Sequence, residues 1–233
     1  MPSLNHFVVQ SPSMPPQQLF LLYHAAGDNP VSMGQIGSWF AEIFPQALVV
    51  SIGGPEASGP APGRQWFNEG ELNDSSLQQR VNEVMPQFLQ SVNEWQQLSG
   101  VQPEATALIG FSQGSVMVLE GSKAQPELAG RIIAFSGRYA SLPEQATAKT
   151  TIHLIHGDED NIYQAGLAQQ AAARLVSLGG DVTLDIVEDL PHAIDQRSMN
   201  LALNHLRYTV PRRYFEEALS GGKPSNDVVT FIH

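Results

Sequence analysis

The sequence predicts an α/β fold with a mostly parallel central sheet and helices on both faces. Short apolar runs alternate with helix-compatible segments at nearly every step of the chain, which is typical of βαβ units. Most of these runs are apolar throughout, as in strands whose two faces are both covered by helices. No internal repeat or domain boundary divides the sequence, so we expect a single domain over residues 1–233.

The first half of the chain is expected to supply three strands and two helices. The strands are predicted at residues 7–9, 19–23 and 48–52, and the first is an edge strand because a proline-rich segment follows it. The helices are predicted over residues 33–44 and 74–98. Their apolar faces are expected to be Ile36, Trp39, Phe40 and Ile43 for the first helix, and Leu77, Val81, Val84, Phe88, Val92 and Trp95 for the second.

The second half of the chain continues the alternation. Four strands and four helices are expected, the first helix directly following Ser112 and the last beginning at Pro211. The tail at residues 221–233 contains Gly, Lys, Pro, Ser and Asn and is expected to be loosely held. The strands are predicted at residues 106–110, 132–135, 151–155 and 182–187, and the second and third helices at about residues 163–178 and 193–208.

The composition excludes several classes of partner. The chain has 12 Lys and Arg against 23 Asp and Glu, a formal net charge of -11, which opposes binding to nucleic acid or to anionic membranes. The absence of cysteine excludes disulfides and thiolate metal sites. The N-terminus lacks the features of a signal peptide, and no run approaches the roughly 18 apolar residues of a membrane span. We therefore expect a cytoplasmic protein, and the sequence leaves its oligomeric state open.

Residues 106–116 combine a predicted strand, a sharp turn and a helix. An apolar run leads into Gly110-Phe111-Ser112-Gln113-Gly114, and a helix-compatible run follows. In such a Gly-x-Ser-x-Gly turn the serine lies at the apex, and the flanking glycines leave room for neighbouring backbone. A plain glycine-rich turn is the alternative, because the pattern arises by chance in roughly one chain in ten of this length. Ser112 therefore requires partners before it can be considered a nucleophile.

A general base is expected at the carboxyl end of another strand, where the chemistry of parallel sheets gathers. Of the seven histidines, His24, His156 and His192 follow predicted strands. His24 and His156 each come directly off a strand before a small residue, which favours inward, hydrogen-bonded structural roles. His192 lies in a loop before a helix, from which an imidazole can reach a neighbouring serine, and is therefore the preferred base.

The carboxylate that would orient this base is expected in the loop after residues 151–155. Asp158 and Asp160 both lie there, and spacing alone does not choose between them; a solvated acidic loop or a helix cap is the simpler alternative. His153, His156 and Asp158 look superficially like a metal cluster, but two histidines three apart on an extended segment point to opposite faces. No metal and no cofactor are expected.

An acyl-transfer site also needs N–H donors for the developing oxyanion. The Gln113 amide, at the start of a helix, is one candidate, and the small residues at 25–27 suggest a second in that loop, which is otherwise a tight turn. Trp66 and Phe67 look exposed in the long connection over residues 53–75. They are expected either to wall an acyl pocket or to pin this connection onto the core.

Taken together in chain order, the candidate site segments resemble those of the phospholipase/carboxylesterase family of α/β-hydrolases. This family includes the acyl-protein thioesterases and small bacterial carboxylesterases. The resemblance covers about residues 19–206 and implies the α/β-hydrolase fold, whose triad has the chain order Ser, Asp, His. It is carried by His24-Ala25-Ala26-Gly27-Asp28, Trp66-Phe67, Gly110-Phe111-Ser112-Gln113-Gly114, His156-Gly157-Asp158-Glu159-Asp160 and His192.

The resemblance implies a role for each site residue. By this likeness Ser112 is the nucleophile, His192 the base and Asp160 the carboxylate that orients it. The backbone N–H groups of Ala26 and Gln113 would form the oxyanion hole. The expected reaction is hydrolysis of small-molecule carboxylic esters of short to medium acyl chain, through an acyl-enzyme and without a cofactor.

Two departures from the family pattern bear on the substrate. Ala25 stands where a glycine is usual, and residues 161–163 stand where a Val-Pro-like pair is usual. Neither removes a catalytic group, but both argue against transferring a substrate preference. An acyl-protein thioesterase and a lysophospholipase are the alternative enzymes, and a ligand-binding module of the same fold is the alternative outside enzymes.

Overall fold

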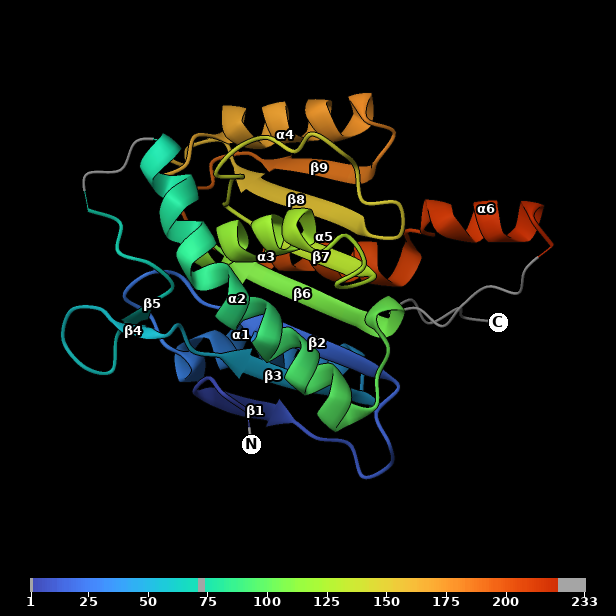
Figure 1. Cartoon of the computed structure of the whole chain (residues 1–233), viewed down its shortest axis with the longest axis horizontal. Coiled ribbons are helices and arrows are strands. Elements are labelled where there is room, and N and C mark those ends of the chain that lie inside the picture. Colours follow the sequence, from blue (N-terminus) through green and yellow to red (C-terminus); the bar gives the residue numbers. More distant parts are fainter. Residues whose placement is uncertain (1, 71–73, 222–233) are drawn as a thin grey trace.

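The computed structural model describes residues 2–70 and 74–221, which form a fold built on a seven-stranded sheet (Figure 1). Within the seven-stranded sheet of these described residues, the first strand alone runs antiparallel to its neighbour. The mostly parallel sheet predicted from the apolar runs is therefore confirmed. In spatial order the strands are β1 (His6–Gln10), β3 (Ala47–Ile52), β2 (Gln18–Tyr23), β6 (Thr106–Phe111), β7 (Arg131–Phe135), β8 (Thr151–Gly157) and β9 (Asp181–Val187).

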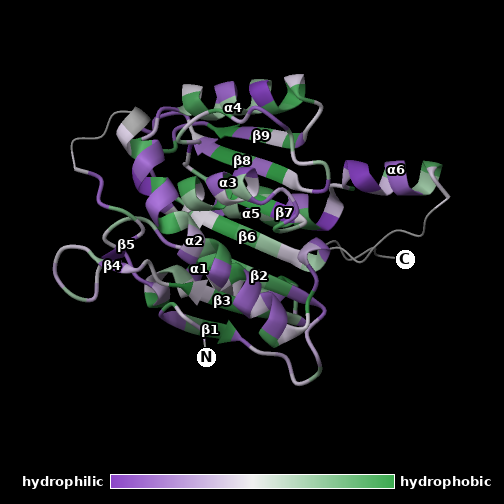
Figure 2. Ribbon diagram, in the orientation of Figure 1, coloured by the Kyte–Doolittle hydropathy of each residue, from purple (hydrophilic) through white to green (hydrophobic). Residues whose placement is uncertain are grey.

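Helices cover both faces of the sheet, as predicted (Figure 1). Figure 2 shows that the strands are largely hydrophobic, whereas the helices carry hydrophilic residues on their outward sides. One face carries α2 (Asp74–Ser99), α3 (Gln113–Ala124) and α4 (Ala165–Ser177); the other carries α1 (Pro30–Ile43) and α5 (Gln196–Tyr208); α6 (Arg212–Leu219) extends beyond the sheet, and a short 3-10 helix (Pro103–Ala105) precedes β6.

The hydrophobic core is divided in two by the sheet. Along β2, Leu21 and Tyr23 belong to the core under α2 and α3, whereas Phe20 and Leu22 belong to the core under α1 and α5. This division follows from the alternation of side chains along a strand. Because both faces are buried, β2 contains no exposed position, which explains its continuous apolar run.

The apolar face of α1 differs from the prediction. Trp39 and Ile43 are 39% and 38% exposed, whereas Met33, Gly37 and Phe40 are buried. The backbone of α1 approaches the side chains of β1 and β3 closely at its buried glycines. The buried face is therefore centred partly on small residues, which a search for large apolar side chains does not find.

The predicted face of α2 is confirmed with one change. Val84 is only partly buried, and the neighbouring Met85 is buried. The connection before α2 contains two short strands, β4 (Glu56–Ala57) and β5 (Arg64–Gln65), which pair antiparallel. In Figure 1 this connection lies beside the edge at which the parallel strands end.

Two predictions about the chain as a whole concern its tail and membrane spans. The tail at residues 221–233 lies outside the described residues except for Gly221. Among the helices of residues 2–70 and 74–221, none is long and apolar enough to cross a membrane.

Candidate active site

Ser112 lies at a sharp turn between β6 and α3. Its backbone has φ 54° and ψ -117°, a conformation that costs a non-glycine residue on the order of 1–3 kcal/mol. A β-carbon on Gly110 would lie 2.5 Å from the Gly114 carbonyl oxygen, and a β-carbon on Gly114 would lie 2.0 Å from the Tyr23 carbonyl oxygen. Close backbone approach therefore requires both glycines of the predicted elbow. The turn presents the serine at the carboxyl ends of the parallel strands.

The Ser112 hydroxyl is one end of a continuous chain of hydrogen bonds. Its Oγ lies 2.8 Å from Nε2 of His192, and Nδ1 of that ring lies 2.8 Å from Oδ2 of Asp160. Because an ionised carboxylate only accepts hydrogen bonds, Nδ1 carries the proton and Nε2 is free to accept from the serine. The three side chains come from the ends of β6, β8 and β9. Of the two acids that spacing left open, Asp160 contacts the ring, whereas Asp158 is exposed.

The Asp160 carboxylate is held by backbone donors of its own loop. Its Oδ1 accepts hydrogen bonds from the N–H groups of Ile162 and Tyr163, both at 2.9 Å. Its Oδ2 also lies 3.2 Å from Nε2 of His156, which donates to the Tyr163 carbonyl oxygen at 2.5 Å. Residues 161–163, which depart from the family pattern, therefore supply two donors to the acid.

The electrostatics of this carboxylate favour its ionised form. Burial raises the pKa of Asp160, but the hydrogen bonds from His192 and from the backbone of Tyr163 and Ile162 outweigh burial, so the net pKa lies below the ordinary aspartate value. Burial lowers the pKa of His156 below the ordinary histidine value. At neutral pH the site therefore combines an ionised Asp160 with a neutral His156, and the carboxylate charge is available to an imidazolium at His192.

The loop that carries His192 is fastened to the end of β8. The Asp158 N–H donates to the Val187 carbonyl oxygen and the Glu159 N–H donates to the Leu190 carbonyl oxygen, both at 3.1 Å. These bonds hold the two loops that carry His192 and Asp160 at the same edge of the sheet.

Two aromatic rings confine the imidazole. Phe111 stacks on the His192 ring with a centroid distance of 5.1 Å, and Tyr163 meets it edge-on at 5.9 Å. The His192 side chain is 17% exposed. The ring is therefore held in orientation by packing as well as by its hydrogen bonds, yet remains open to a substrate.

The two predicted backbone donors lie at the starts of different segments. Gln113 is the first residue of α3, so its N–H has no acceptor in a preceding helical turn. Ala26 lies in the loop after β2, next to Gly27, whose N–H donates to the Arg64 carbonyl oxygen at 2.8 Å. Among the described residues, the N–H groups of Ala26 and Gln113 have no hydrogen-bond partner.

His24 supports the loop that contains Ala26. Its buried ring donates from Nδ1 to the Ala25 carbonyl oxygen at 2.7 Å, and its Nε2 accepts from the Gly54 N–H at 2.9 Å. This is the inward, hydrogen-bonded role predicted for His24. Burial lowers its pKa below the ordinary histidine value, so the ring is neutral, as acceptance of a hydrogen bond at Nε2 requires.

Trp66 and Phe67 are 0% and 2% exposed, so the expectation that this part of the connection is exposed is wrong. The Trp66 ring packs on Tyr23 and Phe88, and its Nε1 donates to the His24 carbonyl oxygen at 3.0 Å. Trp66 therefore pins the connection onto the core, which is one of the two roles considered. Trp66 and Phe67 also line a hollow of about 490 Å³ between the connection and α2.

The side chain of Gln113 has a role that sequence reasoning does not reveal. It is fully buried; its Oε1 accepts from the Trp66 N–H at 2.6 Å, and its Nε2 donates to the Phe67 carbonyl oxygen at 2.8 Å. The same Nε2 lies 3.3 Å from Oε1 of Glu69. The residue after Ser112 therefore fixes the segment 66–69 beside it. The only signal in the sequence is a long amide side chain within an otherwise small and apolar elbow.

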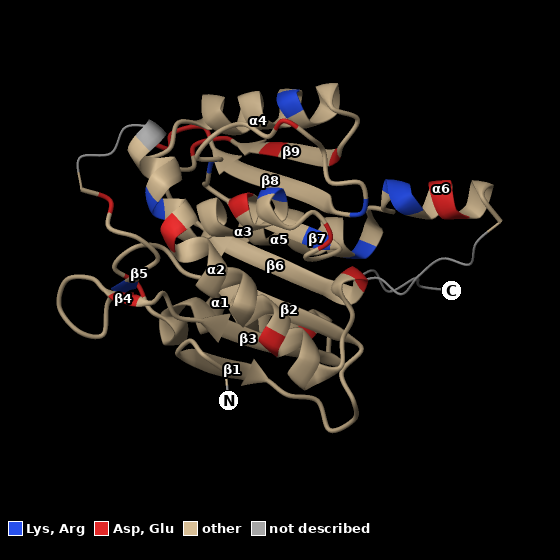
Figure 3. Cartoon of the chain, in the orientation of Figure 1, with Lys and Arg blue, Asp and Glu red and all other residues tan. Residues whose placement is uncertain are grey.

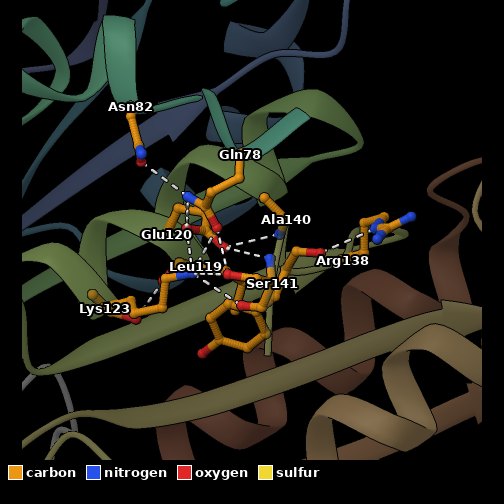
Figure 4. A network of polar contacts seen from close by, with 10 residues as sticks. Gln78, Asn82, Leu119, Glu120, Lys123, Arg138, Ala140 and Ser141 are labelled. Atoms are coloured by element: carbon orange, nitrogen blue, oxygen red, sulfur yellow. Dashed lines mark hydrogen bonds and ion pairs between the residues drawn. The ribbon is translucent and has the colours of Figure 1, made fainter. Parts of the chain in front are cut away.

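A buried carboxylate on α3 also escapes sequence reasoning (Figure 4). Glu120 is 2% exposed; it accepts from the Ala140 N–H at 2.8 Å and from Nε2 of Gln78 at 3.0 Å, and pairs with Nζ of Lys123 at 2.7 Å. Glu120 therefore ties α2 and the segment after β7 to α3, the helix that directly follows Ser112. A charged residue at a helical position gives no sign of such burial.

The remaining strand histidine serves a separate cluster. His153 accepts at Nε2 from Arg131 at 3.0 Å, its Nδ1 lies 2.8 Å from Oγ1 of Thr183, and its ring stacks on His205. His153 and His156 therefore have different partners. In the part of the chain that the structure describes, no three His, Cys, Asp or Glu side chains are grouped so as to hold a metal ion.

Comparison with protein families agrees with this architecture. The model of the family described as Phospholipase/Carboxylesterase matches residues 4–210, a range that includes every strand of the seven-stranded sheet. The chain belongs to this family. The predicted family, the α/β-hydrolase fold and the predicted enzyme class, a carboxylic ester hydrolase, are thereby confirmed.

Several proteins of known name or structure are similar to this chain over most of its length. It is 62% identical over 225 residues to the protein named esterase YpfH of Escherichia coli (strain K12), with 97% of each chain covered. It is 26% identical over 190 residues to acyl-protein thioesterase 1 of Saccharomyces cerevisiae, covering 72% of this chain and 81% of the yeast protein. The crystal structure of esterase PE8 superposes with a TM-score of 0.76 at 26% identity, covering 90% of this chain and 99% of that one.

Proposed function

We propose that this chain is a serine esterase that hydrolyses small-molecule carboxylic esters through an acyl-enzyme on Ser112. The observation that carries the proposal is the unbroken hydrogen-bond chain from Ser112 Oγ through the His192 ring to the Asp160 carboxylate. The 62% identity to a protein named as an esterase supports the substrate class.

Acylation begins with attack of the Ser112 hydroxyl on the ester carbonyl. His192 accepts the hydroxyl proton at Nε2, and the ionised Asp160 stabilises the resulting imidazolium and holds its orientation. The N–H groups of Ala26 and Gln113 donate to the oxyanion of the tetrahedral intermediate. His192 then donates its proton to the leaving alkoxide, and the acyl group stays on the serine.

Deacylation repeats these steps with water in place of the serine. His192 removes a proton from the water as it attacks the acyl-enzyme, and the proton passes to Ser112 when the carboxylic acid leaves. The side chains and backbone groups of this chain suffice for every step, so no cofactor is needed. Trp66 and Phe67 are proposed to bound the substrate site through the segment that Gln113 fixes, and esters of short to medium acyl chain are the proposed substrates.

Covalent labelling tests the nucleophile directly. A fluorophosphonate should label the protein on Ser112, as located by mass spectrometry of peptides, and Ser112→Ala should abolish the labelling. Ser115→Ala is the matched control, because Ser115 is a buried serine one helical turn away, with its Oγ bound to the Phe135 carbonyl oxygen at 2.7 Å. Labelling at any other residue, or none in the folded wild type, would refute the proposal.

A thioester substrate is the alternative that a comparison favours, because the yeast relative is named an acyl-protein thioesterase. Nitrophenyl esters and thioesters with matched acyl chains, compared by kcat/KM, separate the two activities, and lysophosphatidylcholine tests the lysophospholipase. A ligand-induced thermal shift without any product would instead favour a binding module. The complete triad argues against that module, since ligand binding alone does not need it.

A further inference from the structure

Tyr163 contacts the proposed site at several points. Its N–H donates to Asp160 and its ring lies edge-on to His192. Its hydroxyl, on the far side of the ring, lies 3.3 Å from Oε1 of Glu69. A residue in the acid loop therefore reaches across to the connection that precedes α2, and Tyr163 occupies a segment in which this chain departs from its family's usual pattern.

The Glu69 carboxylate has two partners next to the nucleophile. Its Oε1 lies 3.3 Å from Nε2 of Gln113 and 3.3 Å from the Tyr163 hydroxyl. Gln113 directly follows Ser112, and Tyr163 touches the ring of His192. Both partners are donors, so the carboxylate oxygen is held as an acceptor between the elbow and the acid loop.

The Tyr163 hydroxyl stays protonated and donates a hydrogen bond to the Glu69 carboxylate. Burial, and then the nearby Glu69 charge, raise the pKa of Tyr163 above the ordinary tyrosine value, whereas the Arg138 charge acts in the opposite direction. The charges of Glu69 and Asp160 therefore raise the pKa of Tyr163, and the charge of Arg138 lowers it. Arg138 is itself engaged, because its Nε donates to the Tyr139 carbonyl oxygen at 3.0 Å.

Further acids lie along the same edge of the sheet. Asp158 and Glu159 follow β8, Glu188 and Asp189 follow β9, and all four are exposed. Figure 3 shows acidic segments beside the ends of these two strands. The formal net charge of the chain is -11. The surroundings of the nucleophile therefore reinforce the sign of the Glu69 charge, and exposed charges act over about 10 Å at about 0.1 M salt and over longer distances at lower salt.

We infer that the Glu69 carboxylate, fixed by Gln113 and Tyr163, is a specificity-determining group of the substrate site. It disfavours esters that carry a negative charge a few bonds from the reacting carbonyl, and it favours neutral or cationic esters. This inference rests on the proposed esterase activity and names the substrate class of that same site. A like charge at about 10 Å, at the effective dielectric constant of about 20 near a protein surface, alters relative turnover by roughly 15-fold without screening. Screening by salt between about 0.01 and 0.1 M reduces this to roughly 3- to 10-fold.

The test compares three nitrophenyl esters whose acyl chains are equally long and end in a methyl group, a carboxylate or a trimethylammonium group. At low ionic strength we expect the wild type to turn over the carboxylate ester with the lowest kcat/KM. Glu69→Gln should raise the ratio of kcat/KM for the anionic ester to that for the neutral ester by about 3- to 10-fold. Added salt of about 0.5 M should reduce the wild-type discrimination, because it screens the charge.

Glu42→Gln is the matched control, because it makes the same change of net charge at an exposed position near the C-terminal end of α1; it should leave the ratio unchanged. Tyr163→Phe retains the ring against His192 and removes only the hydroxyl that holds Glu69, so it should weaken the discrimination in the same direction. This second variant keeps the test decisive if Glu69→Gln does not fold.

Two outcomes would overturn the inference. One is an anionic-to-neutral ratio that is the same in wild type, Glu69→Gln and Tyr163→Phe. The other is a wild type that prefers the anionic ester, which would show that Arg138 and not Glu69 sets the charge preference. Failure of the esterase proposal is distinguishable, because none of the three esters would then be hydrolysed and the fluorophosphonate would not label Ser112.

Discussion

Gly157 and Leu190 lie so close together that a β-carbon on residue 157 would be 2.0 Å from the Leu190 carbonyl oxygen. Gly157 ends β8, three residues before Asp160, and Leu190 lies two residues before His192. This contact brings the loop that carries Asp160 close to the loop that carries His192.

Gly157→Ala should therefore separate Asp160 from His192. We expect a loss of kcat/KM of at least about tenfold and a destabilisation of about 1–3 kcal/mol from overpacking. Steady-state kinetics and urea unfolding measure the two effects. Gly166→Ala is the matched control, because a β-carbon there meets nothing within 4 Å and should stabilise α4 by about 0.5–1 kcal/mol. Full activity in Gly157→Ala would show that this contact does not set the spacing of the two loops.

Asp160→Asn should lower kcat by about 10³- to 10⁴-fold, because an amide neither fixes the required tautomer of His192 nor stabilises its imidazolium. The matched control is Asp158→Asn, an exposed acid two residues earlier, which should change kcat by less than about twofold. Ester hydrolysis by the two purified variants checks the prediction. If the two variants lost the same activity, Asp160 could not be the orienting carboxylate.

Glu120→Ala should destabilise the protein by about 2–4 kcal/mol, because it leaves the buried Ala140 N–H without its acceptor and removes the carboxylate partner of Lys123. Glu120→Gln keeps an acceptor oxygen and should cost less. Glu127→Ala removes an acid from an exposed ion pair with Lys149 and should change stability by less than about 1 kcal/mol. Urea unfolding curves measure all three variants, and equal effects of the two alanine variants would contradict the importance of the buried network.

Acid should destabilise the protein through its buried histidines. Burial lowers the pKa of His24, His153 and His156 in the folded chain, whereas an unfolded histidine titrates near about 6.5. The unfolded chain therefore binds more protons below this pH, so the stability present above about pH 6.5 is lost as the pH falls toward the folded pKa values. Between pH 7 and 5.5 we expect the free energy of unfolding to fall by about 2–4 kcal/mol.

The control for this pH effect is His153→Asn. Removing one of the three groups should reduce the slope of the free energy of unfolding against pH by up to about 1.4 kcal/mol per pH unit. Urea unfolding at a series of pH values provides both slopes. Identical slopes in the variant and the wild type would show that His153 does not take up a proton on unfolding.

Much of the fold is predictable from the sequence because its central strands are buried on both faces. Continuous apolar runs such as that of β2 indicate strands covered on both sides when helical segments separate them. The face of α1 is not predictable in this way. Its buried side includes Gly37, where close packing on the sheet excludes the large side chains by which an apolar face is detected, and the larger Trp39 is left partly exposed.

The candidate site is predictable from the sequence where it consists of residue types with a characteristic reactivity that lie directly after predicted strands. The Gly-x-Ser-x-Gly elbow and a histidine after a later strand are of this kind, whereas the choice between Asp158 and Asp160 depends on the family resemblance. The contacts of Gln113 and Glu69 are different, because each joins segments more than 40 residues apart. No local pattern encodes such contacts. The domain boundary at 1–233, the cytoplasmic location and the absence of nucleic-acid partners stay predictions.

The φ of 54° at Ser112 lowers the free energy of unfolding of the whole polypeptide. Glycine adopts this region without strain, so Ser112→Gly should raise the thermal unfolding temperature while it removes the nucleophile. The serine hydroxyl is thus retained at a position where glycine would make the folded chain more stable. At this one residue, the proposed ester hydrolysis and a longer lifetime of the folded chain require different side chains.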